Sequence, residues 1–165
     1  MNYDEMLHSI RDERISLAIS TCAEMYIEQG IDPVKMTDVA ARCQIGVASL
    51  YRYFGTKQRF TIKVASYIWE RQMALFEGIY DSAYYREKTG IEQIEELLKV
   101  FHALLRGHRK FLRFVAAFDA YVLRESIPVD QLTEYEGVVL NSMPYMEAAF
   151  AAFYLELTGR LGSAA

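Results

Sequence analysis

Residues 36–60 constrain the fold more than any other stretch of this sequence, because they hold two short helical patterns separated by a break. The first pattern places apolar residues on one helical face, namely Val39, Ala40 and Cys43. The segment 44–46 interrupts it, and apolar residues at helical spacing resume from 47 to 54. Two short helices joined by a tight turn form a helix-turn-helix, the unit whose second helix enters the major groove of DNA.

The residues at the helix ends support this interpretation. We expect Thr37 to cap the first helix with its hydroxyl, and Thr56 to cap the helix that follows the unit. Gly55 ends the second helix at a position where a left-handed residue costs little. Ala40 is small enough for the two helices to cross closely, and Ile45 supplies an apolar wedge for the turn. These signals predict where the two helices start and end.

Several of these residues follow the order typical of one known family: Thr37, Val39-Ala40, Ser49-Leu50-Tyr51, Tyr53-Phe54 and Lys57. Over residues 10–65 the sequence resembles the DNA-binding domain of the TetR family of bacterial transcriptional regulators. The resemblance implies an all-α fold, with a three-helix helix-turn-helix domain at 9–69 and a helical C-terminal regulatory domain at 70–165. In this family the second domain is a bundle that binds a ligand and forms a dimer.

Two residues of the turn depart from the family's pattern. Gln44 stands where the family usually has glycine, at a position that tends toward positive φ, and a side chain costs energy there. Gly46 replaces the usual serine that caps the reading helix, which is the second helix of the helix-turn-helix, and glycine is a weaker cap. These departures concern the geometry of the turn and leave the predicted fold unchanged.

The resemblance also implies which residues meet DNA: Thr37, Val47, Ala48, Ser49, Tyr51, Arg52, Tyr53 and Lys57. Ser49 and Arg52 carry the hydroxyl and guanidinium groups that read base edges. Thr37, Tyr53 and Lys57 are expected on phosphates, which position a protein without reading sequence. For Tyr51 two interpretations remain open, a phosphate contact or a brace for the core.

Charge is distributed unevenly along the chain. The net charge of −4 would argue against nucleic-acid binding, but residues 35–63 carry six basic side chains against Asp38 alone. Residues 1–34 carry seven acidic side chains and two basic ones, and 64–165 are also acidic overall. A basic stripe on the helix-turn-helix within acidic surroundings is the distribution expected for phosphate binding.

The second half of the sequence is rich in aromatic residues and methionine at helical spacing. Such residues form a plain core or line a small-molecule pocket, and the sequence leaves both open. The resemblance implies a pocket, for which we expect these residues: Phe101, Phe114, Phe118, Tyr121, Met143 and Phe150. The effector itself is not identified by the sequence.

The helical pattern extends over the whole chain, and no segment shows the two-residue period of a strand. The expected helices outside the helix-turn-helix are 9–29, 56–79, 91–106, 108–125 and 129–158, the last with a break near Pro144. The family resemblance places further helices after residue 158. The chain is therefore a compact member, a fragment of a longer protein, or one whose dimer uses the helix at 129–158.

Other classes of protein find little support in the sequence. No apolar run approaches the roughly 20 residues that span a membrane, and the start lacks the basic residues of a signal peptide. We therefore expect a cytoplasmic protein. Cys22 and Cys43 are expected as buried, reduced thiols, and no spacing of ligands suggests a metal or other cofactor. No recognisable catalytic arrangement favours an enzyme.

The sequence thus predicts a DNA-binding transcriptional regulator, a repressor released from its operator by a small-molecule ligand. Its expected partners are double-stranded DNA with a palindromic operator, an unknown effector, and a second copy in a homodimer. An alternative is a helical protein–protein interaction module that keeps the helix-turn-helix fold without independent operator binding. The altered turn and the short C-terminal region leave this alternative open.

Overall fold

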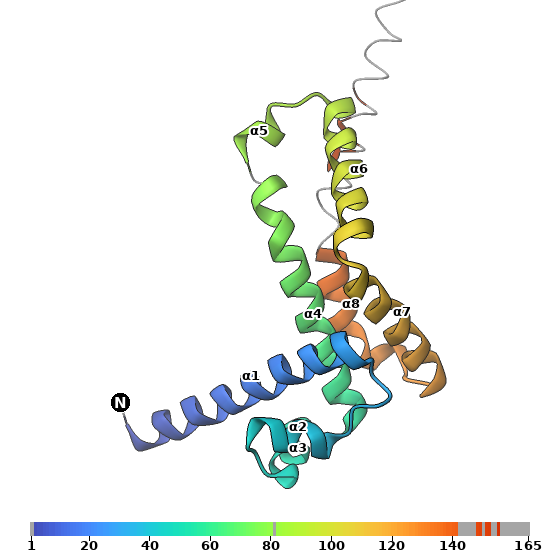
Figure 1. The fold of residues 1–165 in the computed structure, drawn as a ribbon. Helices are drawn as coiled ribbons and strands as arrows, with labels where there is room; N and C mark the ends of the chain where they lie inside the picture. The colour runs from blue at the N-terminus through green and yellow to red at the C-terminus, as the bar shows by residue number, and fades with distance from the viewer. Residues whose placement is uncertain (1, 81, 142–147, 150, 153–154, 156–165) are drawn as a thin grey trace, which may run out of the picture. The chain divides into compact units, whose positions relative to one another are not determined.

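The computed structural model of the protein describes residues 2–80, 82–141, 148–149, 151–152 and 155, without the side chains of residues 76–80 and 101. Within these ranges the chain forms helices and no strand, which confirms the all-α prediction (Figure 1). The elements are α1 (Tyr3–Gln29), α2 (Met36–Cys43), α3 (Val47–Phe54), α4 (Lys57–Tyr80), α5 (Ala83–Arg86), α6 (Gly90–Gly107), α7 (Arg109–Arg124), the 3-10 helix η1 (Val129–Gln131) and α8 (Thr133–Asn141).

The chain divides into two compact units. The first joins Met1–Ile68 with Lys110–Tyr135, and the second joins Trp69–Arg109 with Glu136–Ala165. Most of α7 thus groups with the helix-turn-helix, and the first compact unit is discontinuous in sequence. The division into domains at 9–69 and 70–165 stays a prediction.

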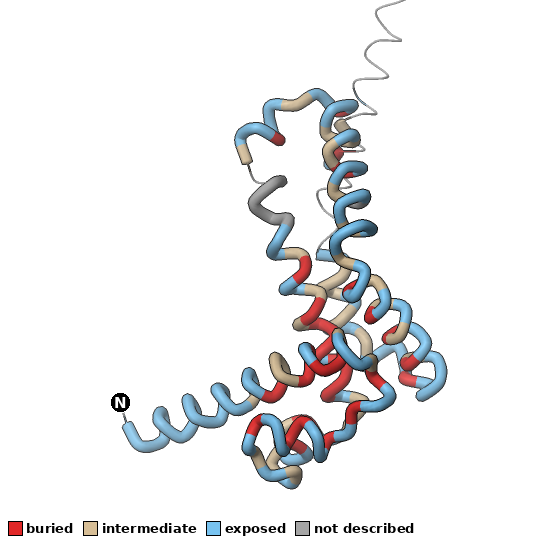
Figure 2. The backbone as a smooth tube through the Cα atoms, viewed as in Figure 1, coloured by how far each residue is buried: buried red, intermediate tan, exposed pale blue. Residues whose placement is uncertain are grey.

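Helix α1 begins six residues earlier than the predicted start at residue 9. Asn2 and Glu5 form a reciprocal cap, in which the Asn2 backbone N–H donates to Glu5 Oε2 at 2.8 Å and the Asp4 N–H donates to Asn2 Oδ1 at 3.4 Å. The helix ends at Gly30, whose φ of 85° lies in the left-handed half of the backbone map. Residues 2–14 are exposed, as Figure 2 shows.

The core of the first unit lies where α1, α2 and α3 contact one another and where α4 begins. Its buried side chains include Ala18, Cys22, Tyr26, Val39, Ala40, Leu50, Phe54, Phe60 and Val64. The rings of Phe54 and Phe60 lie 4.4 Å apart between their centroids, which packs the end of α3 against the start of α4. The small residue Ala40 is buried between the helices, as predicted.

Helix α7 contributes a buried aromatic stripe to the same core. Its members are Phe111, Phe114, Phe118 and Tyr121, spaced so that they share one helical face. The Phe114 ring stacks on Tyr26 of α1 with 6.4 Å between centroids, and Phe118 lies 4.7 Å from the Tyr135 ring. Because these rings are large and apolar, they hold α7 on the first unit.

Tyr26 also makes a polar contact inside this core. Its hydroxyl and the Thr61 hydroxyl of α4 lie 2.9 Å apart, and Thr61 is 0% exposed. Burial raises the pKa of Tyr26 well above its usual value, so the hydroxyl stays neutral. Each of these two buried hydroxyls thereby has a hydrogen-bond partner.

Both cysteines are buried and unpaired, as predicted. Burial raises the pKa of Cys22 to about 12, which keeps its thiol protonated and unreactive. The Cys43 thiol donates to the backbone oxygen of Leu17 at 3.8 Å. These two residues therefore belong to the packing of α1 against α2.

The second unit contains the later part of α4, the short α5, which the sequence did not predict, and α6. Helix α6 opens with a reciprocal cap between Thr89 and Glu92, in which the Thr89 N–H donates to Glu92 Oε2 at 2.8 Å. Glu96 pairs with Lys99 at 3.0 Å and with Lys88 at 3.4 Å. These contacts are local and stabilise α6 itself.

The predicted helix at 129–158 starts differently in the structure. Pro128 precedes the short η1, and α8 follows from Thr133 to Asn141. The break predicted near Pro144 lies outside the described residues. Among the described residues, no helix has both the length and the apolar character to cross a membrane, and none of their side chains forms a cluster suited to a metal ion.

The α7 stripe provides a test of this fold. Phe118→Ala should lower the free energy of unfolding by about 3–5 kcal/mol, because Phe118 is 1% exposed and a cavity would remain. Leu123→Ala, on the same helix but 79% exposed, should change it by less than about 0.5 kcal/mol. Chemical denaturation followed by circular dichroism measures both. Equal losses would contradict the packing of α7 on the first unit.

Candidate nucleic-acid interface

The turn between α2 and α3 adopts the left-handed geometry that the sequence predicted. Gln44 has φ 56° and ψ 38°, and its backbone N–H donates to Ala41 at 3.2 Å. The next residue, Ile45, donates to the Ala40 oxygen at 3.0 Å and is half-buried. Gly46 then starts α3 without a side-chain cap. The turn is thus formed with a side chain at the position that favours glycine.

The cap of α2 differs from our prediction. Thr37 does not cap the helix, because α2 begins at Met36 and its N-cap is Lys35. The Lys35 N–H donates to Asp38 Oδ2 at 3.0 Å, so an acidic side chain three residues into the helix supplies the cap. Thr37 is therefore exposed on the first turn of α2.

Helix α3 spans 47–54, as predicted, and buries Leu50 and Phe54. None of the eight side chains that we expected on DNA is buried. Exposed are Thr37, Ala48, Tyr51 and Arg52, and half-buried are Val47, Ser49, Tyr53 and Lys57. Tyr51 is 45% exposed, which places its ring outside the core. The structure therefore leaves a continuous outer surface on α3 that can approach a ligand.

Lys57 is the first residue of α4. The preceding Thr56 caps this helix as predicted, because its hydroxyl accepts from the Arg59 N–H at 3.1 Å. Gly55, with φ 78°, makes the link between α3 and α4. A basic side chain and the free N–H groups of a first turn both attract anions, so the location suits the phosphate contact expected for Lys57.

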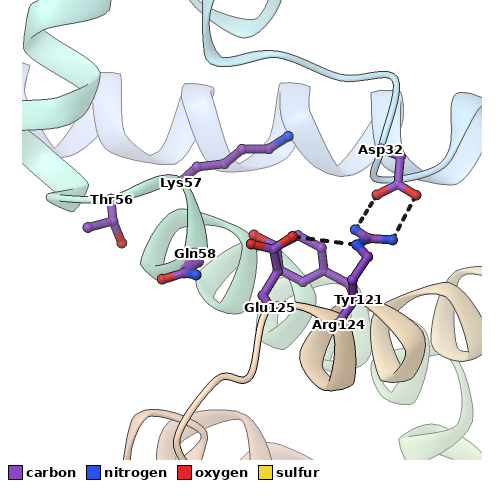
Figure 3. A pocket seen from close by; sticks show the side chains of 7 residues that line it. All are labelled: Asp32, Thr56, Lys57, Gln58, Tyr121, Arg124 and Glu125. Carbon is purple, nitrogen blue, oxygen red and sulfur yellow. Dashed lines mark hydrogen bonds and ion pairs between the residues drawn. The ribbon is translucent and has the colours of Figure 1, made fainter.

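A polar pocket of about 630 Å³ adjoins this helix start (Figure 3). It is lined by Asp32, Thr56, Lys57, Gln58, Tyr121, Arg124 and Glu125. Arg124 of α7 pairs with both carboxylate oxygens of Asp32, at 3.0 Å for Nη1 and Oδ2, and also with Glu125 at 3.5 Å. Among the lining residues, two basic side chains meet two acidic ones, so this pocket has no excess of either charge.

A second groove, of about 350 Å³, lies between α1 and α3 and was not predicted from the sequence. Its lining is Leu7, Ile10, Arg11, Arg14, Arg52 and Tyr53. The guanidinium carbon of Arg52 lies 5.5 Å from the Tyr53 ring centroid, and that of Arg11 lies 6.0 Å from it. Partial burial opposes ionisation of Tyr53, but hydrogen bonds and charge from Arg52 and Arg14 outweigh it and lower its pKa.

Arg11 and Arg14 do not stand out when charge is counted over residues 1–34, because seven acidic side chains outnumber them there. The sequence did contain a signal. Arg11 and Arg14 share a helical face with Leu7 and Ile10, at positions i, i+3, i+4 and i+7. Charge counted by helical face rather than by segment would have found them.

The residues predicted for a ligand pocket fall into two groups. Phe114, Phe118 and Tyr121 are buried in the core of the first unit, and Tyr121 also lines the polar pocket beside Lys57. The Phe101 side chain, Met143 and Phe150 lie outside what the structure describes. The assignment of these six residues to a small-molecule site stays a prediction.

Two short helices joined by a left-handed turn, with an accessible second helix and basic side chains around it, define a helix-turn-helix DNA-binding protein. Residues 18–61 match the model of the bacterial regulatory proteins of the tetR family, a range that runs from the second half of α1 to the start of α4. The chain therefore carries a TetR-type N-terminal DNA-binding domain, which confirms the resemblance. Comparison with curated proteins and with solved structures found no match.

The turn provides one test of this geometry. Gln44→Gly should raise the free energy of unfolding by about 1 kcal/mol, because glycine adopts a φ of 56° without strain. The control Ala41→Gly, three residues earlier in α2, should lower it by about 1 kcal/mol, since glycine weakens a helix interior. Thermal and chemical denaturation measure both changes. Destabilisation by both substitutions would argue against a left-handed turn.

The cap of α2 provides another test. Asp38→Ala should cost about 1 kcal/mol of stability, because it leaves the Lys35 N–H without its acceptor. Thr37→Ala should change stability by only a few tenths of that, since the Thr37 side chain is exposed and does not cap the helix. Chemical denaturation measures both losses. A larger loss of stability for Thr37→Ala than for Asp38→Ala would show that Thr37 caps the helix.

Proposed function

We propose that this protein is a ligand-responsive transcriptional repressor that binds a palindromic operator as a homodimer. The observation that carries this proposal is the accessible outer face of α3, within a segment that matches the tetR-family regulators. Two reading helices, one from each copy, would enter major grooves about one helical turn apart. A small-molecule ligand would release the protein from DNA.

On the operator, the residues of α3 divide by their chemistry. Ser49 and Arg52 would read base edges, since a hydroxyl and a guanidinium both match groups in the major groove. Val47 and Ala48 are small enough to approach the base edges and the thymine methyl group. Tyr51 is exposed and would meet the backbone rather than brace the core.

Three residues outside the base-reading set would fix the position of the protein on DNA. Thr37 lies on the first turn of α2, Tyr53 lies near the end of α3, and Lys57 starts α4. Their contacts would be to phosphates, which carry no sequence information. With Thr37 and Lys57 on phosphates, the positive ends of the α2 and α4 helix dipoles would also lie near the DNA backbone.

The proposed release depends on α4 and α7. Helix α4 runs without interruption from Lys57, beside the expected DNA surface, into the second unit. Helix α7 packs on Tyr26 of α1 and pairs Arg124 with Asp32 in the loop before α2. A ligand held by the C-terminal helices would displace these elements and change the spacing of the reading helices. It can do so only by binding the DNA-free conformation more tightly.

Selection from a random duplex library tests the function. The purified protein should enrich a palindrome with half-sites about one turn apart. Absence of any enriched sequence, from protein shown to be folded, would reject the proposed function.

Lys57→Ala tests the phosphate assignment. With the enriched duplex, the slope of log affinity against log salt should fall by about 1, since each phosphate contact contributes roughly 0.9. Lys110→Ala, which removes an exposed lysine of α7, is the matched control and should keep the slope. Fluorescence anisotropy across a salt series measures both. An unchanged slope for the Lys57 variant would remove Lys57 from the interface.

A further inference from the structure

Three guanidinium groups converge on one tyrosine in the groove between α1 and α3. Arg52 and Arg11 lie within about 6 Å of the Tyr53 ring centroid, at 5.5 and 6.0 Å, and Arg14 lines the same groove. Like charges gathered around one ring repel one another, so an anion placed among them is favoured. Each guanidinium over the ring is also attracted to it.

No carboxylate in the described part of the chain forms an ion pair with these arginines. The ion pairs within that part include neither Arg11, nor Arg14, nor Arg52. The adjacent acidic residues of α1, Asp12 and Glu13, do not line the groove. The polar pocket beside Lys57 differs in this respect, because its two basic side chains face two acidic ones. The groove is thus a concentrated positive site without an internal counter-ion.

The lining also has an apolar side. Leu7 and Ile10 precede Arg11 and Arg14 on the same face of α1, so aliphatic side chains form one part of the groove and guanidinium groups another. A sugar–phosphate unit has the same two parts, an apolar face on the deoxyribose and a charged phosphate. Arginine suits the phosphate, since its planar fork can donate two parallel hydrogen bonds to two oxygens.

We propose that this groove binds a sugar–phosphate unit of the DNA backbone, with Arg11 and Arg14 of α1 acting together with Tyr53 of α3, while Arg52 keeps its place on the base edges. This inference rests on the proposed function, because it extends the same DNA surface beyond the helix-turn-helix. The N-terminal half of α1 then lies as an arm against the DNA backbone, beside the reading helix α3. Its contacts add affinity and fix orientation without selecting a base.

A double substitution tests this assignment. Arg11→Gln with Arg14→Gln removes two positive charges from exposed positions, so the folded state should be retained in a thermal melt. The matched control is Lys110→Gln with Arg113→Gln, which removes two exposed charges at the same three-residue spacing on α7 of the same unit. The probe is a fluorescently labelled, mixed-sequence duplex several turns long. Anisotropy is followed across a salt series.

The expected result is a salt slope lower by about 1 to 2 for the α1 variant, with affinity reduced about tenfold or more at low salt. The control should keep the wild-type slope. Equal losses in both variants would mean a general charge effect and would overturn the proposal. Wild-type affinity and slope in the α1 variant would overturn it as well.

The same series separates this inference from the proposed function. If the wild-type protein fails to bind any duplex, both the proposed function and the assignment of DNA to the groove fail. If the wild type binds and the α1 variant binds equally well, only the groove assignment fails. A library selection with the α1 variant should still enrich the wild-type sequence, because backbone contacts do not select bases. An altered sequence preference would contradict a backbone role.

Discussion

The first unit depends on Tyr26, because this one side chain joins three helices that are distant in sequence. Its ring stacks on Phe114 of α7, and its hydroxyl is hydrogen-bonded to Thr61 of α4, while its own helix contacts α2 and α3. Burying a hydroxyl among aromatic rings costs free energy unless the hydroxyl forms a hydrogen bond. The hydrogen bond between Tyr26 and Thr61 therefore fixes the two side chains relative to each other. This aromatic contact and this hydrogen bond therefore act with the Phe54–Phe60 contact and the Arg124–Asp32 ion pair to orient the helix-turn-helix relative to α4 and α7.

The features that could be predicted from the sequence are those set by neighbouring residues. Helix α3 has the predicted bounds because glycine on both sides and an apolar face within it act over a few residues. The left-handed turn at Gln44 and the cap by Thr56 are local in the same way. The cap of α2 was predicted wrongly because Thr37 and Asp38 both offer an oxygen within one turn. Because α2 begins at Met36, earlier than predicted, Thr37 lies inside the first turn and Asp38 stands at the third helical position, from which it accepts the Lys35 N–H.

The features that could not be predicted arise from contacts between distant residues. The aromatic stripe of α7 has the same spacing whether it packs on α1 or encloses a ligand, so periodicity does not choose between the two. The grouping of Phe114 with Tyr26 requires the structure. The basic groove could not be predicted for the same reason, since it forms only where Arg11 and Arg14 of α1 lie beside Arg52 and Tyr53 of α3. Of the residues that line this groove, the sequence singled out Arg52 and Tyr53 of α3 and omitted Arg11 and Arg14 of α1.

The long N-terminal half of α1 has a further consequence for the energetics of the unit. Residues 2–14 are exposed, so apart from the contacts of Arg11 and Arg14 with Tyr53 this half is held by its backbone hydrogen bonds and by the cap between Asn2 and Glu5. Isolated helices of about 12–15 residues are marginal in water, and fraying from this end costs little free energy. Amide hydrogens there should exchange with solvent sooner than those near Tyr26. An anion seated against Arg11 and Arg14 would slow that exchange, which couples the order of this helix to occupancy of the groove.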